Sequence, residues 1–125
     1  MVLIFGGAYQ GKFSYARERF GLTDADIYCC PDGDTKVPAG RAVYGFERWI
    51  LALLDAGRDV LPAVRSFIAA SSDTVVISRD ISCGVVPADP RLRAWRDETG
   101  KALAMVARAS DEAVRLFCGI PSRIK

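Results

Sequence analysis

The sequence predicts an α/β fold with a mainly parallel sheet of about five strands. Short apolar runs, typical of strands buried on both faces, alternate along the chain with segments of helical periodicity. Half of the 125 residues are apolar, which is enough for a substantial hydrophobic core. No repeat, linker or low-complexity tract divides the chain, so we expect residues 1–125 to form a single domain.

The chain opens with the pattern of a strand, a glycine-rich loop and a helix. The apolar run of residues 2–5 predicts a buried strand, and a helical pattern covers residues 12–20 before Gly21 ends it. Two short strands are expected next, over residues 26–30 and 41–44, separated by a loop rich in turn-forming residues.

Two amphipathic helices are expected in the middle of the chain. Apolar residues recur at helical spacing over residues 46–54 and again over residues 60–68. Gly57 interrupts the pattern between them, and Asp59 is a candidate N-cap for the second helix.

The last third of the chain predicts a strand, a long helix and a final strand. Residues 74–78 (TVVIS) have the composition of an interior strand, and a loop follows over residues 80–88. Asp89 is a candidate N-cap for a helix of residues 90–109 that begins with a proline. The final strand is expected over residues 113–118.

Charge and hydropathy exclude several classes of protein. The 17 basic and 15 acidic residues leave a net charge of +2 with no basic block, so nucleic acid is not an expected partner. No stretch approaches the length of a membrane span and no signal peptide is recognisable, so we expect a cytoplasmic protein.

The cysteine and histidine content narrows the possible chemistry. The four cysteines, Cys29, Cys30, Cys83 and Cys118, form no C-x-x-C pair and are expected to be free thiols. The chain has no histidine. Histidine bases, histidine metal ligands and phosphorylated or nucleotidylated histidine intermediates are therefore excluded.

Residues 6–13 read GGAYQGKF, close to the phosphate-binding pattern G-x-x-x-x-G-K-[ST]. Such a loop turns its backbone N–H groups around phosphate oxygens, and Lys12 would contact the β- and γ-phosphates. Phe13 cannot supply the hydroxyl that normally binds Mg²⁺, and Ser14 is rotated by about 100° around the helix. The alternative is a tight turn between strand and helix. The candidate nucleotide-binding residues are Gly6, Gly7, Ala8, Tyr9, Gln10, Gly11, Lys12, Phe13 and Ser14.

Three motifs in the last third of the chain indicate a family. The chain reads GVVP from Gly84, RAWRDETG from Arg93 and GIPSRIK from Gly119. These resemble the motifs Gly-Ile-Val-Pro, Arg-x-x-Arg-Asp-x-x-Gly and Gly-Ile-Pro-x-x-x-Lys of the bifunctional adenosylcobinamide kinase and adenosylcobinamide-phosphate guanylyltransferase family. The glycine loop is similar to that family's G-G-A-x-S-G-K-S.

The resemblance implies a P-loop NTPase-like three-layer fold and a role in cobalamin biosynthesis. The implied reaction is phosphoryl transfer from ATP or GTP to the hydroxyl of the aminopropanol arm of adenosylcobinamide. The implied partners are a nucleotide and adenosylcobinamide or another corrinoid, and a homo-oligomer is expected.

The chain departs from the family pattern at several positions. The family segment Val-Asp-Cys-Leu-Thr-Leu-Trp is similar to residues 43–49 (VYGFERW), where Tyr44 takes the carboxylate position and Glu47 is the nearest acidic residue. Arg79 and Asp80 stand where the family has Asn-Glu. Because the chain has no histidine, guanylyl transfer through a histidine is excluded.

The expected catalytic residues are Lys12, Asp80, Arg93 and Arg96. Lys12 and the loop amides would bind phosphate, and Asp80 would hold Mg²⁺ through water, unless it only caps its loop. Arg93 and Arg96 share a helical face and would offset developing charge, unless they form a solvated helix flank. Arg79 would either neutralise phosphate or pair with Asp80.

Three functions remain open from the sequence. The first is a kinase of the adenosylcobinamide kinase type. The second is a binding protein or subunit without turnover, because Phe13, Tyr44 and Arg79 all work against Mg²⁺. The third is a kinase or NTPase that acts on an unrelated substrate with the same fold.

Overall fold

The computed structural model describes residues 1–82 and 84–125 and confirms the α/β class. Within these residues six strands form one mostly parallel sheet in the order β2-β3-β4-β1-β5-β6. The strands are β1 (Val2–Gly6), β2 (Ile27–Cys29), β3 (Ala42–Tyr44), β4 (Val75–Arg79), β5 (Glu112–Phe117) and β6 (Ile120–Arg123). The α-helices are α1 (Lys12–Phe20), α2 (Phe46–Asp55), α3 (Val60–Ala70) and α4 (Pro90–Ala109), and a short 3-10 helix, η1 (Asp24–Asp26), precedes β2.

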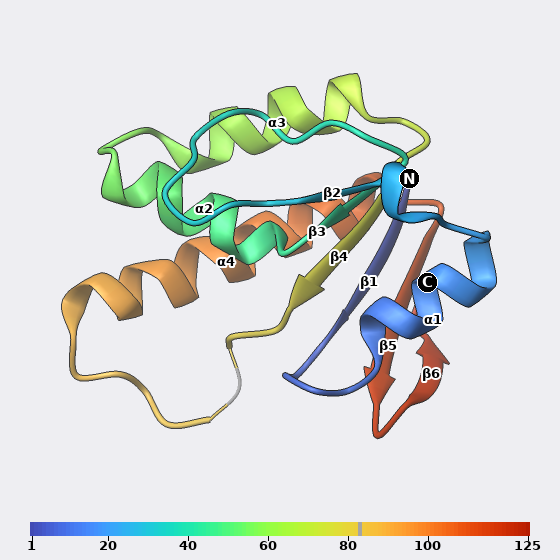
Figure 1. Ribbon diagram of the computed structural model, residues 1–125. Helices are drawn as coiled ribbons and strands as arrows, with labels where there is room; N and C mark the ends of the chain where they lie inside the picture. Colours follow the sequence, from blue (N-terminus) through green and yellow to red (C-terminus); the bar gives the residue numbers. More distant parts are fainter. Residues whose placement is uncertain (83) are drawn as a thin grey trace.

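The sheet is the middle of three layers, as in P-loop NTPase-like folds. Figure 1 shows α1 on one face of the sheet and α2, α3 and α4 on the other. β1 lies at the centre, parallel to both β4 and β5, and β4 continues through β3 to β2. The carboxyl ends of β1, β3 and β4 therefore meet at one edge of the sheet, where ligands bind in open α/β folds.

The sixth strand corrects the expectation of about five. β6 pairs antiparallel with β5 through a two-residue turn, Cys118-Gly119, in which both residues have positive φ, 52° and 75°. This is the backbone geometry of a tight hairpin turn. Pro121 argues against an interior strand, but β6 lies at the edge of the sheet, where proline is tolerated.

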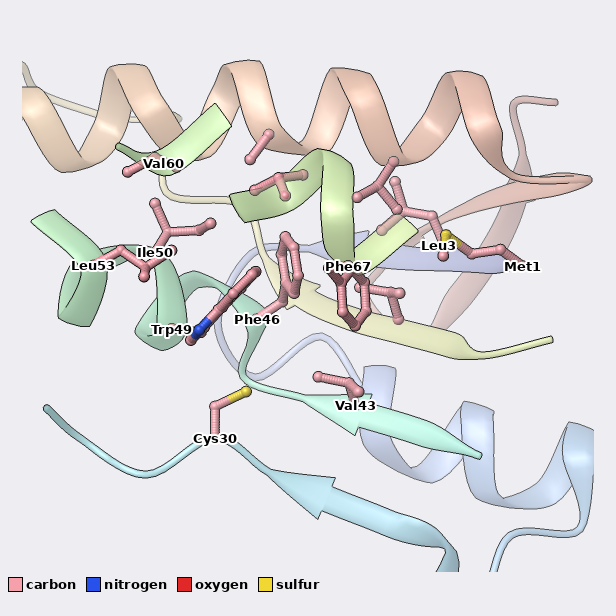
Figure 2. Packing of buried hydrophobic residues seen from close by; sticks show 14 of the residues in the cluster. Met1, Leu3, Cys30, Val43, Phe46, Trp49, Ile50, Leu53, Val60 and Phe67 are labelled. Atoms are coloured by element: carbon pink, nitrogen blue, oxygen red, sulfur yellow. The ribbon is translucent and has the colours of Figure 1, made fainter. Parts of the chain in front are cut away.

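The larger core lies between the sheet and α2, α3 and α4. Its centre is an aromatic group, Phe46, Trp49 and Phe67, whose ring centroids are 5.3 to 5.8 Å apart. Figure 2 shows these rings between the sheet and the overlying helices, with the Cys30 sulfur directed toward them. Such buried rings contribute large apolar areas and favourable tilted contacts, so this layer fixes the position of α2.

A smaller core lies under α1 on the opposite face. Ile4, Ile77 and Leu116 from the central strands pack there against Ala16 of α1. An Arg19–Glu112 pair, with two nitrogen–oxygen distances of 2.6 Å, ties α1 to β5 at the surface. Together these contacts hold α1, and with it the loop that precedes it, against the end of β1.

The structure shows the state of the described cysteines and the character of the described helices. Cys29, Cys30 and Cys118 are free thiols, and Cys83 lies outside the described residues. Burial raises the pKa of the Cys30 thiol to about 12, so this cysteine behaves as an apolar core residue. None of the described helices is long and apolar enough to cross a membrane.

Gly6 marks the point where β1 and β5 come too close for a side chain. A Cβ placed on Gly6 would overlap the backbone carbonyl oxygen of Leu116, whereas a Cβ on Gly7 would be 3.6 Å from the flexible Gln10 side chain. The first glycine of the loop is therefore required by packing between strands, apart from any role with a ligand.

We expect Gly6→Ala to lower the free energy of unfolding by about 1–3 kcal/mol, because the backbone of β1 or β5 must move to accept the methyl group. Gly7→Ala is the matched control and should cost less. Urea denaturation of both variants measures the difference. Equal stabilities would contradict the assignment of Gly6 to this close contact.

Candidate functional site

A cavity of about 510 Å³ lies at the carboxyl ends of β1, β3 and β4. The glycine loop, the ends of β3 and β4 and the first turns of α1 and α2 line it, through Ala8, Tyr9, Gln10, Gly11, Lys12, Phe13, Ser14, Tyr44, Gly45, Glu47, Arg48 and Arg79. The candidate loop residues from Ala8 to Ser14 are therefore together at one cavity, and Gly6 and Gly7 lead into it from β1.

Two helices begin at this cavity. Gly11 is the N-cap of α1 and Gly45 is the N-cap of α2, and both have left-handed φ values, 83° and 77°. Neither glycine has a side chain to accept a hydrogen bond from the first helical N–H groups. The first N–H groups of both helices, each set at the positive end of a helix dipole, thus lie at one cavity, an arrangement that favours a bound anion.

The β5–β6 hairpin supports the glycine loop. The Gly119 amide donates to the Gln10 carbonyl oxygen at 3.2 Å, and the Cys118 amide donates to the Gln10 side-chain oxygen. These two hydrogen bonds tie the loop to the hairpin, while Tyr9 at the loop tip is fully exposed and has a φ of 57°. The motif at residues 119–125 and the glycine loop, far apart in sequence, meet here.

Lys12 is a buried cation directed at the loop. Its side chain is 8% exposed, and Nζ donates to the Gly7 carbonyl oxygen at 2.5 Å. Burial lowers the pKa of Lys12; Glu47 opposes this shift, and Arg79 adds to it. Among the described residues Lys12 forms no ion pair with a carboxylate, so its charge is available to a phosphate group.

Glu47 is the buried carboxylate of the site. It is 7% exposed, and its Oε2 accepts hydrogen bonds from Ser78 Oγ at 3.2 Å and from the Arg79 backbone amide at 3.0 Å. Trp95 of α4 donates to the Glu47 carbonyl oxygen at 2.7 Å. The sequence indicated Glu47 only as the nearest acidic residue; its signal was a carboxylate on the first turn of a helix directly after a strand.

Phe13 and Tyr44 form an aromatic pair where the family pattern has a hydroxyl and a carboxylate. Their ring centroids are 5.0 Å apart with an interplanar angle of 75°, an edge-to-face contact. The Arg48 guanidinium lies 5.6 Å from the Tyr44 ring centroid, and the Arg17 guanidinium lies 5.7 Å from that of Phe13. Both candidate metal-binding positions are thus occupied by rings in mutual contact.

Asp80 lies at a different place from the phosphate-loop cavity. Its carboxylate accepts hydrogen bonds from the backbone amide and hydroxyl of Ser82, as in an Asx turn. It lines a second, mainly apolar cavity of about 240 Å³ with residues of β1 and α4, among them Phe5 and Leu103. Asp80 is therefore not among the residues that line the phosphate-loop cavity, although its backbone amide donates to the Gly6 carbonyl oxygen at 2.7 Å.

Arg93 and Arg96 bind the loop that precedes α4. Arg93 donates to the carbonyl oxygens of Pro87 and Ala88, at 3.3 and 2.9 Å. Arg96 donates to the carbonyl oxygens of Ser82 and Gly84. Neither arginine is among the residues that line the phosphate-loop cavity, and in this arrangement both shape the loop.

The residues around the phosphate-loop cavity do not fit a Mg²⁺ ion. Mg²⁺ takes oxygen ligands in octahedral geometry and is usually held by one or two carboxylates. The carboxylate here, Glu47, already accepts two hydrogen bonds, while Lys12, Arg48 and Arg79 surround the same space with positive charge. Within the described part of the chain there is also no group of three or more metal-binding side chains.

Comparison with known proteins identifies the family. A family model described as cobinamide kinase / cobinamide phosphate guanyltransferase matches residues 48–124, more than half of the chain. This range contains most of α2 and every element from α3 to β6, including the loop-binding arginines of α4 and the hairpin that supports the glycine loop. No curated protein matches the chain. The chain belongs to the cobinamide kinase / cobinamide phosphate guanyltransferase family.

Proposed function

We propose that this protein binds ATP or GTP at the glycine loop, on a single domain formed by residues 1–125. Membership of the family implies a role in cobalamin biosynthesis with nucleotide binding. The observation that carries the proposal is the buried Lys12 beside the N-termini of two helices, in one cavity at the carboxyl edge of the parallel sheet. These are the groups that bind phosphate in this type of loop.

The proposed reaction is phosphoryl transfer to a hydroxyl of a cobinamide. Such transfer depends mainly on positioning and on stabilisation of the charge on the transferred group. Lys12 and the loop amides would hold the terminal phosphates, and the contact between Gln10 and the β5–β6 hairpin would keep those amides in place. The acceptor, a cobinamide or another corrinoid, would approach the open side of the same cavity.

A second candidate function is nucleotide or corrinoid binding without turnover. It is favoured by the Phe13–Tyr44 contact, which replaces two groups that bind metal in the family pattern. Incubation with a cobinamide and ATP or GTP distinguishes the two functions. Formation of a phosphorylated cobinamide supports the kinase, and tight binding with no product supports the second function.

The expected homo-oligomer stays a prediction that light scattering would test.

We expect ATP or GTP to stabilise the protein through Lys12. A ligand that binds only the native state, at about a hundred times its Kd, raises the free energy of unfolding by about 2.7 kcal/mol. Lys12→Met keeps an apolar stem but removes the charge, so it should remove most of this stabilisation. Thermal unfolding with and without nucleotide measures the effect.

The unliganded Lys12→Met variant provides the control. Because burial lowers the pKa of Lys12, the charged ammonium is less stable in the folded protein than in the unfolded chain, although Lys12 keeps its charge. The variant should therefore unfold at the same temperature as the unliganded parent or higher. A nucleotide effect that is equal in parent and variant would exclude Lys12 as the phosphate-binding lysine.

We expect no guanylyl group to become attached to the polypeptide. The chain has no histidine to accept one. Incubation with labelled GTP, followed by mass spectrometry of the intact chain before and after acid treatment, tests this, because a guanylyl group on nitrogen is acid-labile. A stoichiometric covalent adduct would show that another nucleophile, such as a lysine, carries the guanylyl group.

A further inference from the structure

We propose that Arg48 and Arg79 bind the phosphates of the ligand in place of a divalent cation, so that the protein takes its nucleotide without Mg²⁺. This inference rests on the proposed phosphate binding at the glycine loop. It follows from the poor fit of the cavity to Mg²⁺ and from the placement of two arginines in the same cavity. Two guanidinium groups carry together the same formal charge as one Mg²⁺ ion.

Arg48 is held over the cavity by its neighbours. It lies on the first turn of α2, and its guanidinium stacks near the Tyr44 ring. A Cβ on Gly45 would lie 2.5 Å from one terminal nitrogen of Arg48, so this guanidinium uses the space that a side chain at position 45 would fill. The resembling family segment has cysteine and leucine at these two positions. The glycine and the arginine therefore form a matched pair.

Arg79 enters the same cavity from the end of β4. Glu47 holds its backbone amide, while its side chain is exposed and contributes to the cavity wall. Its charge is close enough to Lys12 to lower the pKa of that lysine. Within the described part of the chain, neither Arg79 nor Arg48 forms an ion pair with a carboxylate.

The phosphate-loop cavity has an excess of positive charge, to which Arg48 and Arg79 contribute. Three cations, Lys12, Arg48 and Arg79, share it with one carboxylate, Glu47, which is engaged by Ser78 and by backbone. The excess positive charge repels Mg²⁺ and is relieved when an anion binds. Guanidinium groups are suited to this task because they are always charged and can bind phosphate oxygens in pairs.

Binding of ATP, GTP and inorganic tripolyphosphate, measured by calorimetry in EDTA and in Mg²⁺, tests the inference. For the parent protein we expect Kd values in EDTA that equal or fall below those in Mg²⁺. In EDTA, Arg48→Leu and Arg79→Asn, which install the residues of the family pattern, should each raise Kd about tenfold or more, as for loss of one charge-assisted contact.

Two further variants serve as controls. Arg65→Leu removes an exposed arginine of α3 that does not line the cavity, so it should leave Kd unchanged despite the same change in net charge. Arg48→Lys keeps the charge but not the paired donors, and should weaken binding less than Arg48→Leu. It also provides a second measurement if the leucine variant folds poorly.

The outcomes separate this inference from the proposed function. Binding that requires Mg²⁺ would overturn the inference and leave nucleotide binding at the loop intact. Binding in EDTA that survives both Arg48→Leu and Arg79→Asn would overturn the assignment of the arginines. If none of the three probes binds in either buffer, the proposed function itself fails, and the inference fails with it.

Discussion

The site depends on one buried carboxylate, Glu47. Its side chain accepts hydrogen bonds from the Ser78 hydroxyl and the Arg79 backbone amide at the end of β4. Its backbone carbonyl accepts a hydrogen bond from the indole N–H of Trp95 on α4. Its charge partly offsets the cost of burying Lys12. Because the same residue lies on the first turn of α2, it fixes that helix end, the end of β4 and α4 relative to one another. The cationic side chains of Lys12, Arg48 and Arg79 can therefore lie around the same cavity while these elements keep their positions.

Most strands and helices of the fold were predictable, because hydrophobic periodicity and capping residues are signals that lie within the segment itself. Residues 74–78 and 90–109 were expected as a strand and a helix, and the structure has them within one residue at each end. Asp89 caps α4 by accepting from the Arg91 amide, as its place before Pro90 predicts. β6 was missed because its evidence is tertiary: a strand of four exposed residues with a proline is stable only along the edge of β5.

The candidate site was predictable only where it is continuous in sequence. The glycine loop was recognisable because its spacing and its place after a buried strand carry the signal. The catalytic roles of Asp80, Arg93 and Arg96 are expected from motif and resemblance and stay predictions, because the direction of a side chain at a strand end or on a helix is not readable from spacing. These three side chains hydrogen-bond to the loop before α4. Arg48 and Glu47, from a helix whose pattern predicts core packing, line the phosphate-loop cavity.

The edge-to-face contact of Phe13 and Tyr44 also constrains how this sequence can change. Each ring is half-buried and provides part of the surface on which the other rests. Replacing one alone by a small polar residue removes contacts from the remaining ring and leaves unfilled space beside it. The two positions are therefore energetically coupled. A protein with only one of the two rings replaced by the family residue should be less stable than the parent. A return to the family residues at positions 13 and 44 is therefore least destabilising when both residues change together.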